Sequence, residues 1–308
     1  MKQRVLVPLN TGIPRLAVLG LGLVGVVGCD RFDHGDGAHW DELSGLEPGP
    51  PFELAMIADL PEPAQRFLAW SIAEGTPLAR SVGLEMEGTI VLDPERGSIP
   101  IEAEQVLAPP EGFIWSAGTT GGWMRIRGFD RFVDGRGEMR WKLFGLIPVM
   151  TATGSDVTRS AAARLLMESV MVPSALVPRA DLDRFRWEAV DAEHALFEAT
   201  VAGETVRTTL QVAEDGRPVR AWADRWNEGQ YERFQVELSG EHRVGGYRLP
   251  RHVRAGWRPG EPDELWFFDA ELTRASFPGN SDASRGDNSS PPHATEPGSR
   301  SSDSKEGR

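Results

Sequence analysis

Nucleophilic chemistry has few possible carriers in this 308-residue chain. Cys29 is the single cysteine, and residues 60–276 contain neither a Gly-x-Ser-x-Gly nor a Ser-x-x-Lys motif. Covalent catalysis needs an activated nucleophile beside a base that a third group orients. His194, His242 and His252 lie in strand-like stretches beside charged residues and lack zinc-ligand spacing. The sequence therefore predicts no catalytic residue, no metal site and no cofactor, and it favours a protein without enzymatic activity.

Carboxylate pairs keep a hydrolase as a third interpretation. Glycoside hydrolysis requires two carboxyl groups across a cleft, one of them holding its proton. The sequence does not give that separation, and most carboxylates in strands and turns are simply solvated. The pairs are Glu102 with Glu104, Asp130 with Asp134, and Asp224 with Glu228.

Cys29 itself follows a stretch that is typical of an export signal. Residues 1–28 begin with basic side chains, continue through an apolar run and end on the small Gly28. The apolar run 16–27 is too short for a comfortable transmembrane helix, which needs about 20 residues. The letters VVGC resemble the bacterial lipobox, in which the cysteine thiol forms a thioether to diacylglycerol. We therefore expect residues 1–28 to be a signal peptide and Cys29 to be the lipid attachment site.

Lipid attachment predicts an exported protein that is anchored to the cell membrane and faces the periplasm or the outside. Two or three acyl chains anchor a protein stably. Asp30 resembles the signal that retains enteric lipoproteins on the inner membrane, but that rule varies between bacteria, so both membranes stay open. The alternative is a plain secretory signal or an anchor helix with an incidental cysteine.

The flanks of the expected domain have the composition of flexible segments. Residues 29–59 contain eight acidic residues and one arginine, besides several glycines and prolines, and they predict an acidic, flexible linker after the lipidated cysteine. Residues 277–308 contain no large apolar residue after Phe277, which predicts a disordered tail. Residues 60–276 then form a single β-rich domain.

The charge balance limits the partners. The net charge is −13 at pH 7, whereas binding to nucleic acid needs clustered cations, so a nucleic-acid partner is excluded. No basic amphipathic stretch suggests docking on a membrane surface, and the lipid alone is expected to hold the protein there.

The hydrophobic pattern changes along the domain. Residues 61–77 predict a helix bounded by Pro61 and Gly75. From residue 82 onward, apolar and polar side chains alternate with the period of antiparallel strands. Residues 154–173 interrupt them with one inserted helix. Ten to twelve strands with two helices indicate a mainly β (α+β) domain, built on a large curved antiparallel sheet or open half-barrel.

Several blocks of this domain resemble those of an uncharacterised bacterial family over about residues 75–275. The blocks are "GTPLARSVGLEMEG", "IEAEQVLAPPEGFIW", "GFDRFVDGRGEMRWKLFGLIPV", "GSDVTRSAAARLLMESVMVPSALVP" and "LPRHVRAGW", in this order. The family has no assigned activity, so the resemblance implies none. Its pattern of helix, strands, inserted helix and further strands is similar to the lipoprotein-carrier type of open half-barrel.

Aromatic residues supply the candidate ligand site. Eight of the ten tryptophans lie in predicted strands, where large rings fill a core or line an apolar cavity. Arg125 and Arg127 share one face with Trp123 and Phe129 in the alternating pattern. Such arginines bind an anionic head group or, alternatively, cover an outer face of the sheet.

The inserted helix supplies the candidate polar anchors. Arg159 or Glu168 would hold the polar part of a ligand if either faces a cavity. Glu168 also lies one helical turn after Arg164 and can pair with it instead. The predicted ligand-binding residues are Glu104, Trp115, Trp123, Arg125, Arg127, Trp141, Arg159 and Glu168.

The sequence thus favours an envelope lipoprotein that binds a lipid or another apolar ligand in a curved sheet. The alternative is an assembly protein whose sheet docks a protein partner.

Overall fold

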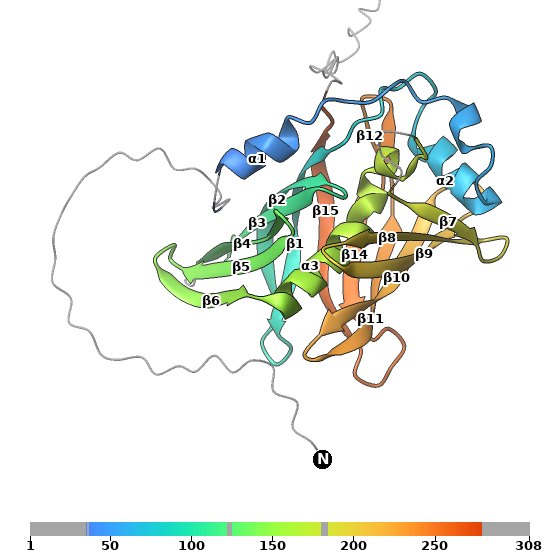
Figure 1. Cartoon of the computed structure of the whole chain (residues 1–308). Coiled ribbons are helices and arrows are strands. Elements are labelled where there is room, and N and C mark those ends of the chain that lie inside the picture. Colours follow the sequence, from blue (N-terminus) through green and yellow to red (C-terminus); the bar gives the residue numbers. More distant parts are fainter. Residues whose placement is uncertain (1–34, 36, 122–124, 180–183, 279–308) are drawn as a thin grey trace, which may run out of the picture.

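The computed structural model describes residue 35 and residues 37–121, 125–179 and 184–278. Within this part the chain forms three α-helices and three short 3-10 turns around one large sheet (Figure 1). The helices are α1 (Gly37–Ser44), α2 (Glu62–Ser71) and α3 (Ser155–Met167), and the turns are η1 (Leu54–Ile57), η2 (Glu168–Met171) and η3 (Pro173–Leu176). The predicted helices at 61–77 and 154–173 are confirmed as α2 and α3.

Thirteen described strands form one antiparallel sheet in the order β6-β5-β4-β3-β2-β1-β15-β14-β11-β10-β9-β8-β7. The strands on the first side are β1 (Val82–Asp93), β2 (Gly97–Ala108), β3 (Gly112–Thr119), β4 (Ile126–Val133), β5 (Arg136–Leu143) and β6 (Ile147–Thr153). Those on the second side are β7 (Arg186–Ala189), β8 (His194–Val201), β9 (Glu204–Val212), β10 (Pro218–Asn227), β11 (Gln230–Ser239), β14 (His252–Trp257) and β15 (Leu265–Ser276). A separate pair consists of β12 (His242–Val244) and β13 (Tyr247–Leu249).

The predicted fold class, a mainly β open half-barrel with an inserted helix, is confirmed. The described strands outnumber the predicted ten to twelve. The difference includes β12 and β13, which have three residues each and are too short to show a period of two.

The sheet curls around α3, which crosses its concave face. Helix α3 packs against β4, β5 and β6 on one side and against β9 and β10 on the other (Figure 1). Small residues permit this approach. A Cβ at Gly137 would lie 2.6 Å from the carbonyl oxygen of Val157 in α3, and the buried run Ala161-Ala162-Ala163 keeps the helix slim.

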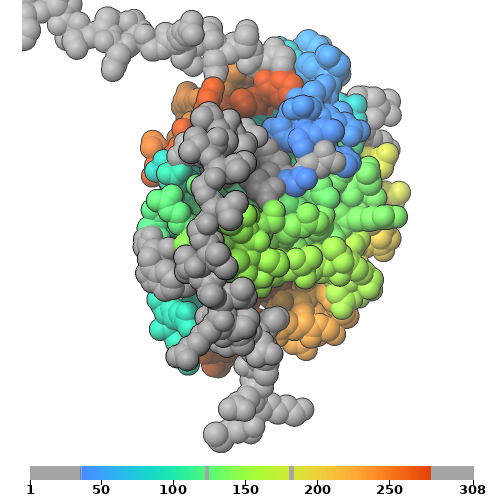
Figure 2. All heavy atoms as spheres, turned by 90° about the vertical axis from the view of Figure 1, so that its left-hand side faces the viewer, coloured from blue at the N-terminus to red at the C-terminus, as the bar shows by residue number. Residues whose placement is uncertain are grey.

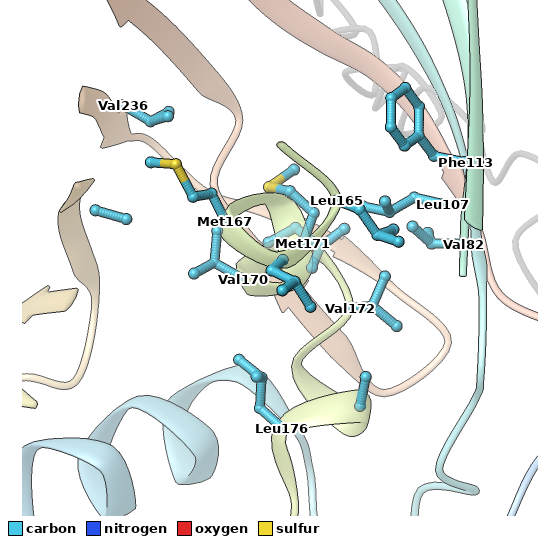
Figure 3. Packing of buried hydrophobic residues seen from close by; sticks show 14 of the residues in the cluster. Val82, Leu107, Phe113, Leu165, Met167, Val170, Met171, Val172, Leu176 and Val236 are labelled. Carbon is cyan, nitrogen blue, oxygen red and sulfur yellow. The ribbon is translucent and has the colours of Figure 1, made fainter. Parts of the chain in front are cut away.

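One end of the half-barrel, the closed end, is filled by the chain from α3 to η3. Leu165 points from this segment toward Leu107 and Val82, and Met167 points toward Val236 on the other side (Figure 3). Val170 and Met171 are buried in the same core. The closed end is therefore a solid hydrophobic core.

The segment before α2 differs from the predicted flexible linker over residues 37–59. Helix α1 buries Leu43 against Val106, Ala108 and Ile114 on the convex face of the sheet. Phe52 is fully buried in the main core. The acidic composition of this segment predicts a solvated linker, but the burial of Leu43 and Phe52 stabilises a packed conformation.

The predicted signal peptide, the predicted lipid site Cys29 and residues 279–308 of the predicted disordered tail lie outside the described residues. Phe277, the first residue of the predicted tail, is instead buried and stacks on Tyr247. No described helix is both long and apolar enough to cross a membrane.

Candidate functional site

A cluster of polar side chains lies between α3 and the concave face of the sheet. At its centre, Arg164 of α3 donates through Nε to Oε1 of Glu168 at 2.7 Å, one helical turn away. The same guanidinium donates through Nη1 to Oδ2 of Asp130 on β4 at 3.2 Å. The predicted pairing of Arg164 with Glu168 is therefore confirmed, and Arg164 also connects α3 to the sheet.

Two neutral groups complete this polar cluster. Trp141 of β5 donates its indole N–H to Oδ1 of Asp130 at 2.9 Å, and Gln105 of β2 donates to Oε2 of Glu168 at 2.6 Å. The rings of Phe113 and Trp115 lie under the guanidinium of Arg164, 4.8 and 5.1 Å from its Cζ. Each carboxylate of the polar cluster thus accepts hydrogen bonds from two side chains. Arg164 contacts both carboxylates and two aromatic rings.

Burial dominates the electrostatics of the polar cluster. It raises the pKa of the Asp130 carboxyl above its ordinary value, although Arg164 and the indole N–H of Trp141 oppose this shift. Glu168 and Asp130 hold Arg164 in its protonated form and raise its pKa. The charges of the polar cluster are therefore compensated by its own residues, which leaves few hydrogen-bonding groups for a ligand.

Arg225 lies on the same concave face but in a different environment. It follows Ala221 and Ala223 in the alternation of β10, and both alanines are buried in the core. Its Nε donates to the carbonyl oxygen and to Oγ of Ser160 in α3 at 3.0 and 3.1 Å. Within the described part of the chain, no carboxylate pairs with it and its two terminal amino groups donate no hydrogen bond.

Aromatic rings surround Arg225. Its Cζ lies 4.9 Å from the ring centroid of Phe234 and 5.3 Å from that of Trp257. Burial lowers the pKa of Arg225 to about 10, and repulsion from the nearby Arg164 contributes to the shift. The Arg225 side chain is thus a cation at neutral pH and lies in apolar surroundings. Its two terminal amino groups donate no hydrogen bond among the described residues.

The end of the half-barrel opposite the closed end, the open end, carries large apolar side chains that α3 does not fully cover. They follow the fully buried residues along the central strands, and they are only half-buried where the strands continue past the helix. They are Met86, Ile90, Trp141, Trp257, Phe267 and Phe268. Trp115 joins two of these rings, because its centroid is 5.6 Å from Trp141 and 6.1 Å from Phe268.

The structure brings three of the predicted ligand-binding residues together. Trp115, Trp141 and Glu168 meet at the polar cluster on the concave face. Arg159 lies further toward the start of α3, with its Cζ 4.3 Å from the ring of Trp226 and its Nε 3.4 Å from Glu204. It is therefore paired at the β9–β10 side and does not face the polar cluster.

The other predicted residues are elsewhere. Glu104 pairs with Ser116 and Glu85 across the strands, on the face opposite Gln105. Arg127 lies three positions before Asp130 on β4, so its side chain points to the opposite, convex face. Arg125 is exposed just before β4. Trp123 lies outside the described residues.

Glu104 lines a pocket on the convex face. This pocket of about 380 Å³ lies between α1 and strands β1, β2 and β15. Its polar lining includes Ser44, Glu85, Glu104, Arg274 and Ser276. Arg274 contacts Glu85 at 3.3 Å and so compensates one of the two carboxylates in this lining.

Catalytic groups do not assemble in a pocket in the described part of the chain. His252 contacts Asp269 at 2.7 Å and Ser239 at 3.5 Å, which places a serine, a histidine and an aspartate in a row. All three lie on adjacent strands of an exposed sheet face, and the Ser239–His252 distance is too long for an activated nucleophile. No described group of three or more His, Cys, Asp or Glu side chains could hold a metal ion.

A residue of the concave face that sequence reasoning missed is Arg225. A signal exists in the letters AWADR, because strict alternation places Arg225 on the same face as Ala221 and Ala223. An arginine on an apolar strand face predicts a buried cation. The missing information was which face α3 covers.

A model for a family of unknown function, DUF6544, matches residues 50–268. The resemblance to an uncharacterised family is thereby confirmed, with a start before the expected residue 75. No curated protein matches the chain.

Three solved structures are similar to this chain at low sequence identity. A domain described as an outer membrane lipoprotein-sorting protein from Vibrio parahaemolyticus is 9% identical, with a TM-score of 0.40 over 75% of this chain and 94% of that one. A LolA-superfamily protein from Nitrosomonas europaea is 12% identical, with a TM-score of 0.35 over 70% and 91%. A DUF1329 family protein from Desulfovibrio piger is 13% identical, with a TM-score of 0.37 over 67% and 89%.

Proposed function

The chain belongs to the DUF6544 family of unknown function, and we propose from its own site that it binds an amphipathic, lipid-like ligand with an anionic head group. The apolar part of the ligand lies on the aromatic surface at the open end of the half-barrel. The head group meets Arg225 on the concave face, beside α3.

The observation that carries this proposal is that the two terminal amino groups of Arg225 donate no hydrogen bond within the described part of the chain. A half-buried cation that no described carboxylate contacts destabilises a fold, so its presence calls for a compensating role. A guanidinium binds a carboxylate or phosphate through two parallel hydrogen bonds, and the two terminal amino groups of Arg225 are available for them. Arg164 serves as the internal comparison, because Asp130 and Glu168 already occupy it.

The apolar half of the site supports the same ligand class. Contiguous apolar surface that is not fully covered favours a binding site, and ligand pockets combine such surface with a few polar groups. Trp257 belongs to both parts, since it lies under Arg225 and is half-buried at the open end. A chain that extends from Arg225 over Trp257 toward Phe267 would satisfy both requirements.

The predicted export and lipid anchor complete the proposal. An anchor at Cys29 holds the half-barrel at the cell membrane, exported and facing the periplasm or the outside. Amphipathic molecules are concentrated there, so the proposed location and the proposed ligand agree.

A second candidate function is the docking of a protein partner. Strand β6 is an edge of the sheet and almost all of its residues are exposed, including Ile147 and Met150. An open edge strand can pair with a strand of another chain. Capture of a stoichiometric protein partner without any bound lipid would favour this candidate over ligand binding.

A titration with a fluorescent fatty acid tests the proposed function. We expect Arg225→Met to weaken binding about tenfold or more, which corresponds to the loss of a charge-assisted hydrogen-bonded pair. Arg220→Met is the matched control, because Arg220 is exposed on the same strand and bonds Gln211. The corresponding fatty alcohol has no anionic head group and should bind both variants alike. Equal fatty-acid affinity in all three proteins would overturn the role of Arg225.

A further inference from the structure

The hairpin tip between β5 and β6 exposes a group of apolar side chains. Residues 144–147 form this hairpin tip, where Phe144, Leu146 and Ile147 are 49%, 82% and 57% exposed. Soluble surfaces tolerate single exposed apolar residues, but a contiguous group indicates a contact with something apolar.

The backbone of the hairpin tip adopts the same kind of turn as Asp134-Gly135, Ala202-Gly203 and Glu228-Gly229. Phe144 and Gly145 both have positive φ, 55° and 72°, as in the two-residue turns that prefer Asn-Gly. A phenylalanine in this conformation is locally unfavourable. The amide of Phe144 donates to the carbonyl oxygen of Arg125 at 2.6 Å, which ties the hairpin tip to β4. Of these four turns, this one has a large apolar side chain at its first position, and that side chain is 49% exposed.

Cations collect next to the hairpin tip on the convex face. Arg127 and Lys142 are direct cross-strand neighbours, and Arg140 follows opposite Phe129. Together with Arg125, Arg127 and Lys142 form what we call the basic strip, whereas Arg140 pairs with Glu138. Residues 112–129 and 139–155 contain no aspartate or glutamate, although the whole chain carries a net charge of −13. Figure 2 shows the green surface of β4 to β6, with α1 in blue above it.

The length of the chain connects this face to the predicted anchor. A Cβ at Gly35 would lie 2.6 Å from the ring of Phe129, so Gly35 rests on the convex face beside the basic strip. Five residues separate Gly35 from Cys29, and the six Cα–Cα steps between them reach about 20 Å when extended. A flexible linker up to residue 59 would have reached about 100 Å. The packed N-terminal segment therefore confines the fold to the vicinity of the membrane.

We propose that the hairpin tip and the basic strip together bind the surface of an anionic phospholipid bilayer. The apolar side chains of the hairpin tip enter the interface, and Arg125, Arg127 and Lys142 meet the lipid head groups. Peripheral binding of this kind combines buried apolar area with attraction between cations and anionic lipids. The proposal rests on the lipid anchor of the proposed function, and it fixes which face of the half-barrel meets the membrane.

The lone cysteine makes a direct test possible. In the lipidated protein the Cys29 thiol is blocked, so a cysteine introduced as Leu146→Cys is the only group that a thiol-reactive, environment-sensitive fluorophore can label. The unsubstituted protein controls for labelling. Val190→Cys is the matched site, because Val190 is an exposed apolar residue, 53% accessible, in the turn between β7 and β8.

The labelled proteins are reconstituted in vesicles of phosphatidylglycerol and phosphatidylcholine, or of phosphatidylcholine alone. We expect the probe at position 146 to show blue-shifted emission and protection from aqueous iodide in the anionic vesicles only, and the probe at position 190 to show neither. Adding Arg127→Glu and Lys142→Glu should abolish the blue shift. A probe at position 146 that stays as exposed as that at position 190 would overturn the proposal.

The outcomes separate the two proposals. Protein that fails to incorporate into vesicles, with Cys29 open to labelling, would overturn both the anchor and the bilayer contact built on it. Protein that incorporates but keeps its hairpin tip in water would overturn the bilayer contact alone. Fatty-acid binding should be unchanged by Arg127→Glu and Lys142→Glu, since both residues lie on the convex face.

Discussion

The rings of Trp115 and Phe268 lie 6.1 Å apart between centroids, although β2 and β1 separate their strands in the sheet. Three strand spacings of a flat sheet would span about 14 Å. The side chains converge because the sheet is strongly curved and because the concave positions between them are small, Ala103 on β2 and Gly88 on β1. This curvature creates the aromatic surface on which the proposed ligand lies.

Substitution of Gly88 tests whether the close approach of β1 to β15 contributes to the stability of this curved sheet. A Cβ there would lie 2.2 Å from the carbonyl oxygen of Asp269 and 2.7 Å from Cβ of Ala270. We expect Gly88→Ala to destabilise the protein by about 1–3 kcal/mol, as overpacking does, and to lower the melting temperature. Gly37→Ala, where nothing lies within 4 Å of the added atom, should leave it unchanged. Equal melting temperatures would show that β1 and β15 can separate freely.

Arg164 tests whether the polar cluster holds α3 to the sheet. Arg164→Met leaves Asp130 and Glu168 as uncompensated carboxylates, and we expect a loss of about 3–5 kcal/mol at pH 7. Burial already raises the pKa of Asp130 and Arg164 opposes that shift, so without the arginine this pKa rises further and the folded state binds more protons than the unfolded state as the pH falls. The stability deficit should therefore shrink toward pH 4 in denaturant titrations. A deficit that does not depend on pH would contradict an electrostatic role.

Arg225 should affect stability in the opposite direction. Its pKa in the folded protein is lowered to about 10 from an ordinary 12.5, so the protonated side chain destabilises the fold at every pH below about 10. We expect Arg225→Met to raise the free energy of unfolding at pH 7 by about 1–3 kcal/mol while it weakens ligand binding. Urea titration of the ligand-free protein measures this. A less stable variant would indicate that Arg225 serves the fold.

Substitution of Cys29 tests the predicted lipid attachment of the protein. We expect Cys29→Ala to abolish labelling with radioactive lipid precursors and to release the protein from the lipid-anchored state. Membrane fractionation with lipid labelling measures both effects. The apolar run before residue 28 can still hold an unprocessed chain on the membrane, so labelling is the decisive readout. Unchanged labelling would exclude Cys29 as the acceptor.

The fold was predictable from the sequence because its signals are local. Alternation of apolar and polar side chains marks each long strand, and Pro61 and Pro173 bound the regions that contain α2 and α3. The order of these elements then implies a curved antiparallel sheet. Residues 37–59 were misread because their charge dominates the composition, while single residues such as Phe52 determine their packing.

The site was less predictable because it depends on register and on which face is covered. Trp115, Trp141 and Glu168 are close only because α3 crosses the concave face. The same lack of register hid the basic strip, in which Arg127 and Lys142 come from two strands and form no amphipathic stretch in the sequence. Arg225 illustrates the limit most clearly, since an arginine in a strand is usually solvated.

The central claim is that the concave face holds an anionic amphiphile at Arg225, and native mass spectrometry of protein gently extracted from its own membranes tests it most directly. We predict that the protein and its Arg220→Met variant carry an additional mass that fragmentation identifies as a single anionic lipid or fatty acid. The Arg225→Met variant should lack this mass while remaining folded. Protein that carries no such ligand in any variant, or that retains it without Arg225, would contradict the account.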